Sequence, residues 1–165
     1  ARVRLFRDHG QSKKYNHQVV GYNARMNELC AAALRIKLPH LQEWTDGRRR
    51  VAAGYRKGLE GVEGVFIPED PANVEAVYHL FVIEVDGRDD VLAKLHDAGV
   101  GAGMHYPVPV HHQEAYAHLG VPKDAFPEAT QNAAKCISLP MFPELTDEQV
   151  AYVCEQVRLA VGPSK

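Results

Sequence analysis

The sequence predicts an α/β domain in which a small sheet is covered on one side by helices. The clearest strand is the run at 77–85, which is rich in β-branched and aromatic residues and is closed by Asp86-Gly87. A helix is expected at 88–98, with Gly99 as its C-terminal stop, and a further strand at 100–106. Strand, helix and strand in succession are typical of an α/β unit.

Two helices are expected before this unit, at about 26–38 and 40–59. Apolar residues recur at intervals of three and four through both segments, and Pro39 falls between them. Asn23 stands where a cap for the first helix is expected. The run Arg48-Arg49-Arg50 in the second helix is interpreted as solvated helix surface rather than as a binding patch.

Shorter elements complete the predicted fold. Strands are expected at 65–67 and 137–140, and helices at 112–119 and 127–135. Thr146 and the acidic turn after it predict the start of a last helix. The apolar stripe of that helix comprises Val150, Val153, Cys154, Val157 and Val161.

Composition narrows the class of partner. The 165 residues carry 19 Lys+Arg and 21 Asp+Glu, a formal net charge of −2, so no long-range field gathers nucleic acid or anionic lipid. We therefore expect a small-molecule or protein partner. The longest apolar runs fall far below the ~18 residues that a membrane span needs, which predicts a cytoplasmic protein. The cysteines Cys30, Cys136 and Cys154 form no C-x-x-C pair and are expected to be small buried hydrophobes.

Histidines are the first candidates for chemistry. His105, His111 and His112 lie within eight positions, but their spacing matches no common zinc pattern, so no metal site is expected. His79, inside a predicted strand, is more typical of a core histidine than of a catalyst. His105 and Tyr106 stand at the end of a predicted strand, before Pro-Val-Pro, where side chains project into a cleft. An imidazole beside a phenol can both donate and accept hydrogen bonds near neutral pH.

The segment 21–26 is the second candidate, because a loop that enters a helix offers free backbone N–H groups. The amide of Asn23 and the guanidinium of Arg25 suit a phosphate or a carboxylate. A plain capping role for Asn23 stays equally open. No nucleophile constellation is expected, because the three serines show no obvious base companion. These serines are Ser12, Ser138 and Ser164.

Taken in order, four segments resemble signatures of the DegT/StrS-type sugar aminotransferases. They are GYNARMNELCAA at 21–32, YHLF at 78–81, HYPVPVH at 105–111 and SLPMFPELT at 138–146, and they span nearly the whole chain. That family uses pyridoxal 5′-phosphate (PLP) on the fold type I aminotransferase scaffold. The resemblance implies the C-terminal portion of such an enzyme. Residues 1–60 would then form an interdomain segment with a long helix and 61–165 the small C-terminal α/β domain, with the large PLP-lysine domain absent.

The resemblance also implies an activity, namely PLP-dependent transamination of a nucleotide-linked keto-sugar with glutamate as amino donor. The lysine that forms the Schiff base lies upstream of this stretch, so no catalytic residue is assigned here and the chain alone is expected to be inactive. Two alternatives stay open. Some members are sugar dehydratases with histidine in place of that lysine, and a non-catalytic binding or regulatory module with the same small-domain fold is the third reading.

By the same resemblance, Asn23 reaches the PLP phosphate across the boundary of a homodimer with a shared active site. Arg25 lies near the sugar nucleotide or a substrate carboxylate. The side chains of His105 and Tyr106 position the substrate. The implied substrate-binding residues are Arg25, His105, Tyr106, Tyr22 and His79.

Overall fold

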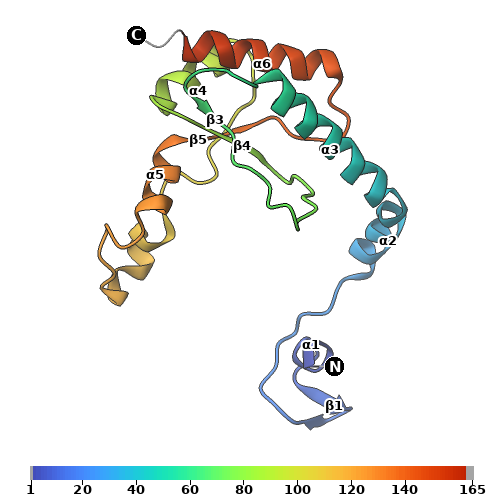
Figure 1. Ribbon diagram of the computed structural model, residues 1–165. Coiled ribbons are helices and arrows are strands. Elements are labelled where there is room, and N and C mark those ends of the chain that lie inside the picture. The colour runs from blue at the N-terminus through green and yellow to red at the C-terminus, as the bar shows by residue number, and fades with distance from the viewer. Residues whose placement is uncertain (1, 163–165) are drawn as a thin grey trace. The chain divides into compact units, whose positions relative to one another are not determined.

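The computed structural model describes residues 2–162 (Figure 1). The chain divides into two compact units, with the division between Leu41 and Gln42. The boundary at residue 60 that the family resemblance implies concerns the domains of a longer protein and stays a prediction. No helix within the described residues is long and apolar enough to cross a bilayer.

The first unit contains two helices and a small hairpin. Its elements are α1 (Arg2–Phe6), β1 (Gln11–Lys13), β2 (Asn16–His17), α2 (Glu28–Lys37) and the 3-10 turn η1 (Leu38–His40). The cap of α2 is Asn27, whose side chain accepts a hydrogen bond of 2.9 Å from the backbone N–H of Cys30. The expectation that Asn23 caps this helix is wrong, because Asn23 pairs with Asp8 in an isolated antiparallel bridge four residues earlier.

The apolar side chains of α2 remain exposed. None of its residues is buried, and Leu29 and Ile36 are 83% and 72% exposed. Cys30 is exposed as well, which corrects the expectation that all three cysteines are buried; Cys136 and Cys154 are buried. The helix therefore carries an apolar surface that the described residues do not cover.

The second unit is built on a three-stranded antiparallel sheet of order β3-β4-β5. Its elements are α3 (Leu41–Gly58), β3 (Val65–Phe66), β4 (Phe81–Val85), α4 (Arg88–Asp97), the 3-10 turns η2 (Val110–His112) and η3 (Glu114–Leu119), α5 (Pro127–Lys135), β5 (Cys136–Leu139) and α6 (Asp147–Val161). β4 is the central strand and pairs with both of its neighbours.

One face of this sheet carries the core. Phe81, Ile83 and Val85 alternate along β4 and are at most 2% exposed, and Ile137 and Leu139 of β5 join them. Buried residues of α3, α4 and α6 belong to the same cluster, and Figure 1 shows these three helices on one side of the sheet. The predicted sheet covered on one side by helices is confirmed.

Several elements follow their local sequence signals. Thr146 caps α6 in a capping box with Gln149, and the stripe predicted on that helix is buried except at its last member, Val161, which is half-buried. Gly99 adopts φ +74° after α4, as a helix stop requires. Pro127 opens α5, and the segment predicted as a helix at 112–119 forms 3-10 turns instead.

Two predicted strands are wrong over part of their length. The strand expected at 77–85 begins only at Phe81, because Tyr78 takes a left-handed backbone conformation with φ +49°. The strand expected at 100–106 is reduced to one bridge, in which Gly103 and Ser138 exchange backbone hydrogen bonds of 3.0 and 2.7 Å. Glycine weakens extended structure, which explains why pairing stops there.

The arginine run on α3 is only partly solvated: Arg50 is exposed, as expected, but Arg48 and Arg49 are half-buried, and for these two the expectation is corrected. Arg48 Nη1 donates to the carbonyl of Tyr78 at 3.1 Å and to that of Met141 at 2.9 Å. Arg49 Nε donates to the carbonyl of Ala76 at 3.0 Å. The carbonyl of Tyr78 lies where the predicted strand fails, so a guanidinium donor replaces a neighbouring strand as its partner.

Buried Tyr55 of α3 predicts a loss of stability at alkaline pH. Its side chain is fully buried, its hydroxyl donates to the carbonyl of Pro140 at 2.8 Å, and burial raises its pKa from the ordinary value of 10.0. Because unfolding releases a phenol that ionises near pH ~10, the free energy of unfolding falls as pH rises above that value. Burial raises the pKa of the Cys154 thiol too, so the decline begins near its ordinary value of 9.0.

We expect urea titrations across this pH range to show that Tyr55→Phe is less stable than the parent near neutrality but loses stability less steeply at alkaline pH. The matched control is Tyr152→Phe, which removes a hydroxyl donating to the carbonyl of Ala98 at 2.8 Å from a ring that is 46% exposed. This control retains Tyr55 and should keep the parent slope. Equal slopes for both variants would contradict the assignment.

Candidate active site

Polar donors gather on the extended segment between β2 and α2. Asn23 Oδ1 accepts a 3.4 Å hydrogen bond from Arg25 Nε, and Arg25 Nε lies 3.9 Å from Asp8 Oδ1. Within residues 2–162, the amide nitrogen of Asn23 and the two terminal nitrogens of Arg25 have no hydrogen-bond partner. All three side chains of the predicted motif, including that of Tyr22, are exposed. The segment thus presents uncommitted N–H donors.

The carboxylate of Asp8 lies within ion-pair distance of Arg25. The hydrogen bond from Gln11 lowers the pKa of Asp8, and the charge of Arg25 adds to that effect, so the carboxylate stays ionised. Backbone hydrogen bonds from Tyr22 to Phe6 at 2.7 Å and from Ala24 to Arg7 at 2.8 Å fix the same segment against α1. An anion would therefore meet donors on a backbone that is already ordered.

His105 and Tyr106 lie on the second unit, beyond the bridge at Gly103. Their ring centroids are 5.3 Å apart at an interplanar angle of 73°, and both side chains are exposed. Tyr106 is 72% exposed, so its hydroxyl is available to a ligand. The expectation that this pair ends a strand is wrong, but the pair does project from the edge of the sheet.

Ser138 was missed as a partner of His105. Its hydroxyl lies 2.9 Å from His105 Nδ1, although the sequence suggested no base companion for any serine. The two residues are 33 positions apart, and only the pairing of Gly103 with Ser138 brings them together, so no local spacing signals the contact. Ser164 lies outside the described residues.

His79 is an exposed residue of the turn before β4, not a core histidine within a strand, and that expectation is corrected. It lines a cavity of about 300 Å³ together with Tyr78, Arg56 and Asp70. Arg56 Nη2 and the Tyr78 hydroxyl both donate to Asp70 Oδ2, which orders the wall of this cavity. Neither His105 nor Ser138 lines this cavity.

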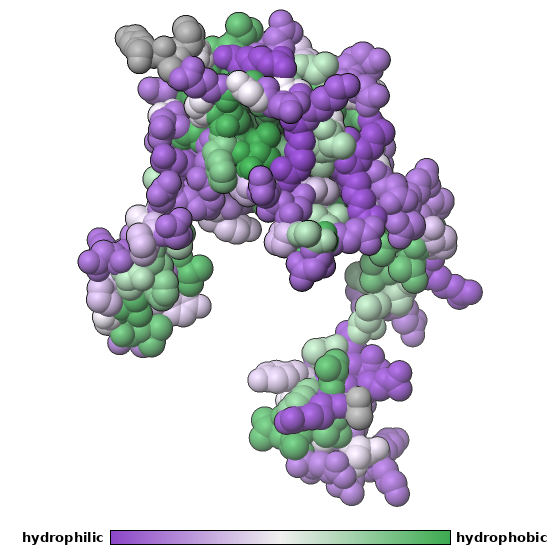
Figure 2. Space-filling view, viewed as in Figure 1, coloured by the Kyte–Doolittle hydropathy of each residue, from purple (hydrophilic) through white to green (hydrophobic). Residues whose placement is uncertain are grey.

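The remaining histidines of the cluster have structural partners. The Nε2 atoms of His111 and His112 lie 3.2 and 2.9 Å from the same carbonyl, that of Lys123, and the ring of His111 packs on Phe126. Among residues 2–162, no three His, Cys, Asp or Glu side chains are grouped to hold a metal ion. Figure 2 shows apolar side chains on the lobe that η2, η3 and the start of α5 form.

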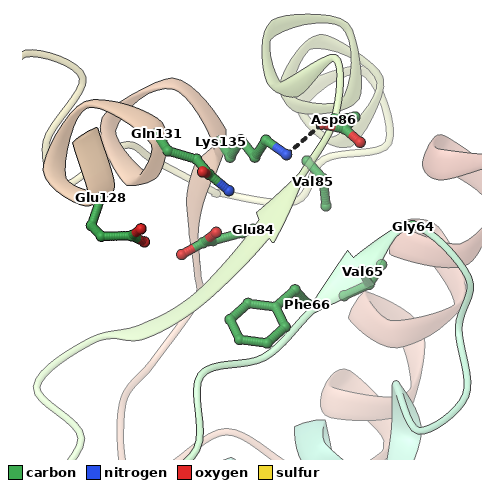
Figure 3. Close-up of a pocket in the computed structure, with 9 residues that line it drawn as sticks. All are labelled: Gly64, Val65, Phe66, Glu84, Val85, Asp86, Glu128, Gln131 and Lys135. Carbon is green, nitrogen blue, oxygen red and sulfur yellow. Dashed lines mark ion pairs between the residues drawn. The ribbon is translucent and has the colours of Figure 1, made fainter. Parts of the chain in front are cut away.

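A second hollow, of about 480 Å³, lies between β3, β4 and α5 (Figure 3). Glu84 and Glu128 face it, and Lys135 Nζ makes a 2.8 Å ion pair with Asp86 at its rim. The hydrogen bond with Asp86 raises the pKa of Lys135, which therefore remains protonated. A lysine held as a cation suits an ion pair and not an amine that must act as a nucleophile.

Comparison with known proteins decides the family. The model of the DegT/DnrJ/EryC1/StrS aminotransferase family matches residues 1–158. The chain belongs to this family. One curated relative is the UDP-N-acetyl-3-dehydro-alpha-D-glucosamine 3-aminotransferase of Acidithiobacillus ferrooxidans. It is 40% identical to this chain over an alignment that covers 95% of the chain and 42% of that protein. The erythromycin biosynthesis sensory transduction protein EryC1 of Saccharopolyspora erythraea is 43% identical over 92% of the chain and 42% of that protein.

Solved structures of DegT/DnrJ/EryC1/StrS aminotransferases agree with the fold. DesV of S. venezuelae superposes with a TM-score of 0.94 at 36% identity, over 99% of this chain and 44% of DesV. A family aminotransferase of Brucella abortus gives a TM-score of 0.88 at 30% identity, over 98% of this chain and 43% of that one. The chain thus spans about two fifths of the length of the relatives that it matches.

Proposed function

We propose that this chain is the C-terminal part of a cytoplasmic, PLP-dependent aminotransferase that converts a nucleotide-linked keto-sugar into an amino-sugar, with glutamate as amino donor. The observation that carries the proposal is the similarity, over 95% of the chain, to an aminotransferase named for a UDP-linked 3-dehydro sugar. A dTDP-sugar transaminase of Streptomyces venezuelae is 38% identical over the same share of the chain. The shared chemistry is an amino group placed on a sugar that carries a nucleotide.

The residues present fit the phosphate of PLP. Asn23 offers two uncommitted amide hydrogens, and a dianionic phosphate binds where several donors converge from ordered backbone. In the proposed homodimer, Asn23 of one subunit completes the cofactor site of the other. When bound, PLP supplies an electron sink for moving an amino group between two substrates.

The other site residues would bind and orient the substrates. The planar guanidinium of Arg25 retains two terminal nitrogens for a bidentate contact to a carboxylate or a nucleotide phosphate. His105 and Tyr106 would hydrogen-bond the sugar, and Tyr22 and His79 would line the approach to it. Holding the reacting groups in place accounts for much of the rate that an enzyme gains.

The apolar surface of α2 also supports a longer protein. A helix with Leu29 and Ile36 largely exposed is stabilised when another part of a protein covers it. We assign that role to the large PLP-lysine domain that the family resemblance implies.

The test uses the complete protein that contains this chain. Purified protein should absorb near the visible edge because of bound PLP, and borohydride should abolish that band by reducing the link to lysine. With glutamate and a nucleotide-linked keto-sugar, the product should be an amino-sugar together with 2-oxoglutarate, measured by mass spectrometry.

Other results would favour the alternatives. A dehydrated sugar with no consumption of glutamate would identify a dehydratase. Protein without the PLP band, even after incubation with PLP, would favour a binding or regulatory module. One relative carries a regulatory name: a protein of Geobacillus stearothermophilus that is 41% identical to this chain is called a pleiotropic regulatory protein.

A further inference from the structure

Among residues 2–162, Ser138 is the only buried residue of a polar or charged type. It is 4% exposed and lies in β5 between Ile137 and Leu139, which belong to the core cluster. Because side chains alternate along a strand, its hydroxyl points to the opposite face of the sheet from these two neighbours. On that face lies the imidazole of His105, with Nδ1 at 2.9 Å from the hydroxyl oxygen.

The hydrogen-bond inventory of this pair selects one tautomer of His105. Within residues 2–162, the Ser138 hydroxyl has no hydrogen-bond partner other than His105 Nδ1. If Nδ1 carried the proton, it would donate to the hydroxyl oxygen and leave the buried O–H without an acceptor, which is unfavourable. If the hydroxyl donates to Nδ1, both groups are satisfied. The neutral ring then carries its proton on Nε2.

The surroundings favour a ring held in one orientation. A Cβ placed on Gly103 would lie 3.4 Å from His105 Cε1, so the glycine backbone closely backs this edge of the imidazole. The ring of Tyr106 lies against it at 73°. His105 as a residue is exposed, and within residues 2–162 its Nε2 has no hydrogen-bond partner, so Nε2 is the ring nitrogen left for a ligand.

We propose that Ser138 is a positioning residue that holds His105 in the Nε2–H tautomer, so that His105 donates a hydrogen bond to an oxygen of the nucleotide-linked sugar. This inference rests on the proposed function for the identity of the substrate. It predicts a hydroxyl or carbonyl oxygen as the partner of Nε2, because an N–H donor rejects a second donor. Ser138 itself does not contact the substrate.

The first test reads the tautomer without any substrate. Complete protein labelled with ¹⁵N-histidine would be studied by long-range ¹H–¹⁵N correlation, with the His105 signals assigned from their loss in His105→Gln. In the parent, Nδ1 should show the shift of an unprotonated acceptor and Nε2 that of an N–H. Ser138→Ala should convert this pattern into a mixture of tautomers, whereas Ser138→Thr retains a hydroxyl and should preserve it.

The second test measures steady-state kinetics with the nucleotide-linked keto-sugar. Ser138→Ala should raise KM about three- to tenfold, as expected for one weakened hydrogen bond, with kcat within about twofold of the parent. Ser138→Thr should recover most of the loss. The matched control is Ser12→Ala, because Ser12 is exposed and is expected to leave both constants unchanged.

Three results would overturn the inference: a parent protein with the proton on Nδ1, an unchanged tautomer in Ser138→Ala, or an unchanged KM in Ser138→Ala. The parent measurement does not depend on Ser138→Ala, so it stands even where that variant fails to fold. Failure of the proposed function is read separately, from the absence of PLP binding or transamination in the parent protein.

Discussion

Replacement of Asn23 by alanine in the complete protein is expected to weaken PLP retention about 10- to 100-fold. A hydrogen bond to a charged group contributes about 1.5–3 kcal/mol, and 1.4 kcal/mol corresponds to a factor of ten. Asn23 has the free amide donors that such a bond needs, since its only hydrogen bond within residues 2–162 is the one that its oxygen accepts from Arg25. The dissociation constant would be measured by titrating PLP into apoprotein and following the quenching of intrinsic fluorescence.

The control is Asn27→Ala, four residues further along the same segment. Asn27 caps α2 through its side-chain oxygen, so alanine there should reduce helix stability by about 1 kcal/mol and leave PLP affinity nearly unchanged. A similar loss of affinity in both variants would mean that the segment acts through its folding. Unchanged affinity in Asn23→Ala would remove Asn23 from the phosphate site.

The two asparagines also illustrate where the sequence misled. A helix was expected from about residue 26 with Asn23 as its cap, which placed Asn27 inside the helix, whereas Asn27 is the cap in the structure. Tertiary pairing decides between them, because Asn23 is extended against Asp8 and the chain reaches helical geometry only after Asn27. The sequence indicated Asn23 as a candidate for an anion site, but it could not show that the side chain of Asn23 does not cap α2.

Elements whose signals are local were predicted well. The cap and acidic first turn of α6, the proline at the start of α5 and the glycine after α4 each fix a boundary through neighbouring residues alone. The existence of strand β4 was also predicted, because its β-branched and aromatic residues are a local signal, although the strand begins only at Phe81. Such features need no knowledge of distant segments.

Features that depend on distant partners were missed. The hydroxyl of Ser138 and the ring of His105 meet only because a single bridge closes the edge of the sheet. The glycine-rich segment before His105 reads as an apolar strand from composition, yet it pairs at Gly103 alone. A pattern of residue types does not reveal which backbone groups find partners in another element.

Substitution of Arg48 by alanine is expected to lower the free energy of unfolding by about 2–3 kcal/mol. One guanidinium nitrogen donates to the carbonyls of Tyr78 at 3.1 Å, His79 at 3.4 Å and Met141 at 2.9 Å, so it ties α3 to two separate segments. Tyr78 and Met141 are half-buried, and their carbonyls would lose a charged donor. Urea titration of parent and variant measures the difference.

Lys57→Ala is the matched control, because Lys57 is an exposed cation on the same helix and should change stability by no more than about 0.5 kcal/mol. Arg48→Lys should recover only part of the lost stability, because the shorter lysine side chain does not place its ammonium group to donate equally well to the carbonyls of both segments. Because His79 follows Tyr78 directly, Arg48→Ala should also raise KM for the nucleotide-linked sugar if His79 lines the site. A variant as stable as Lys57→Ala would show that water replaces the guanidinium and that other contacts hold the turn before β4.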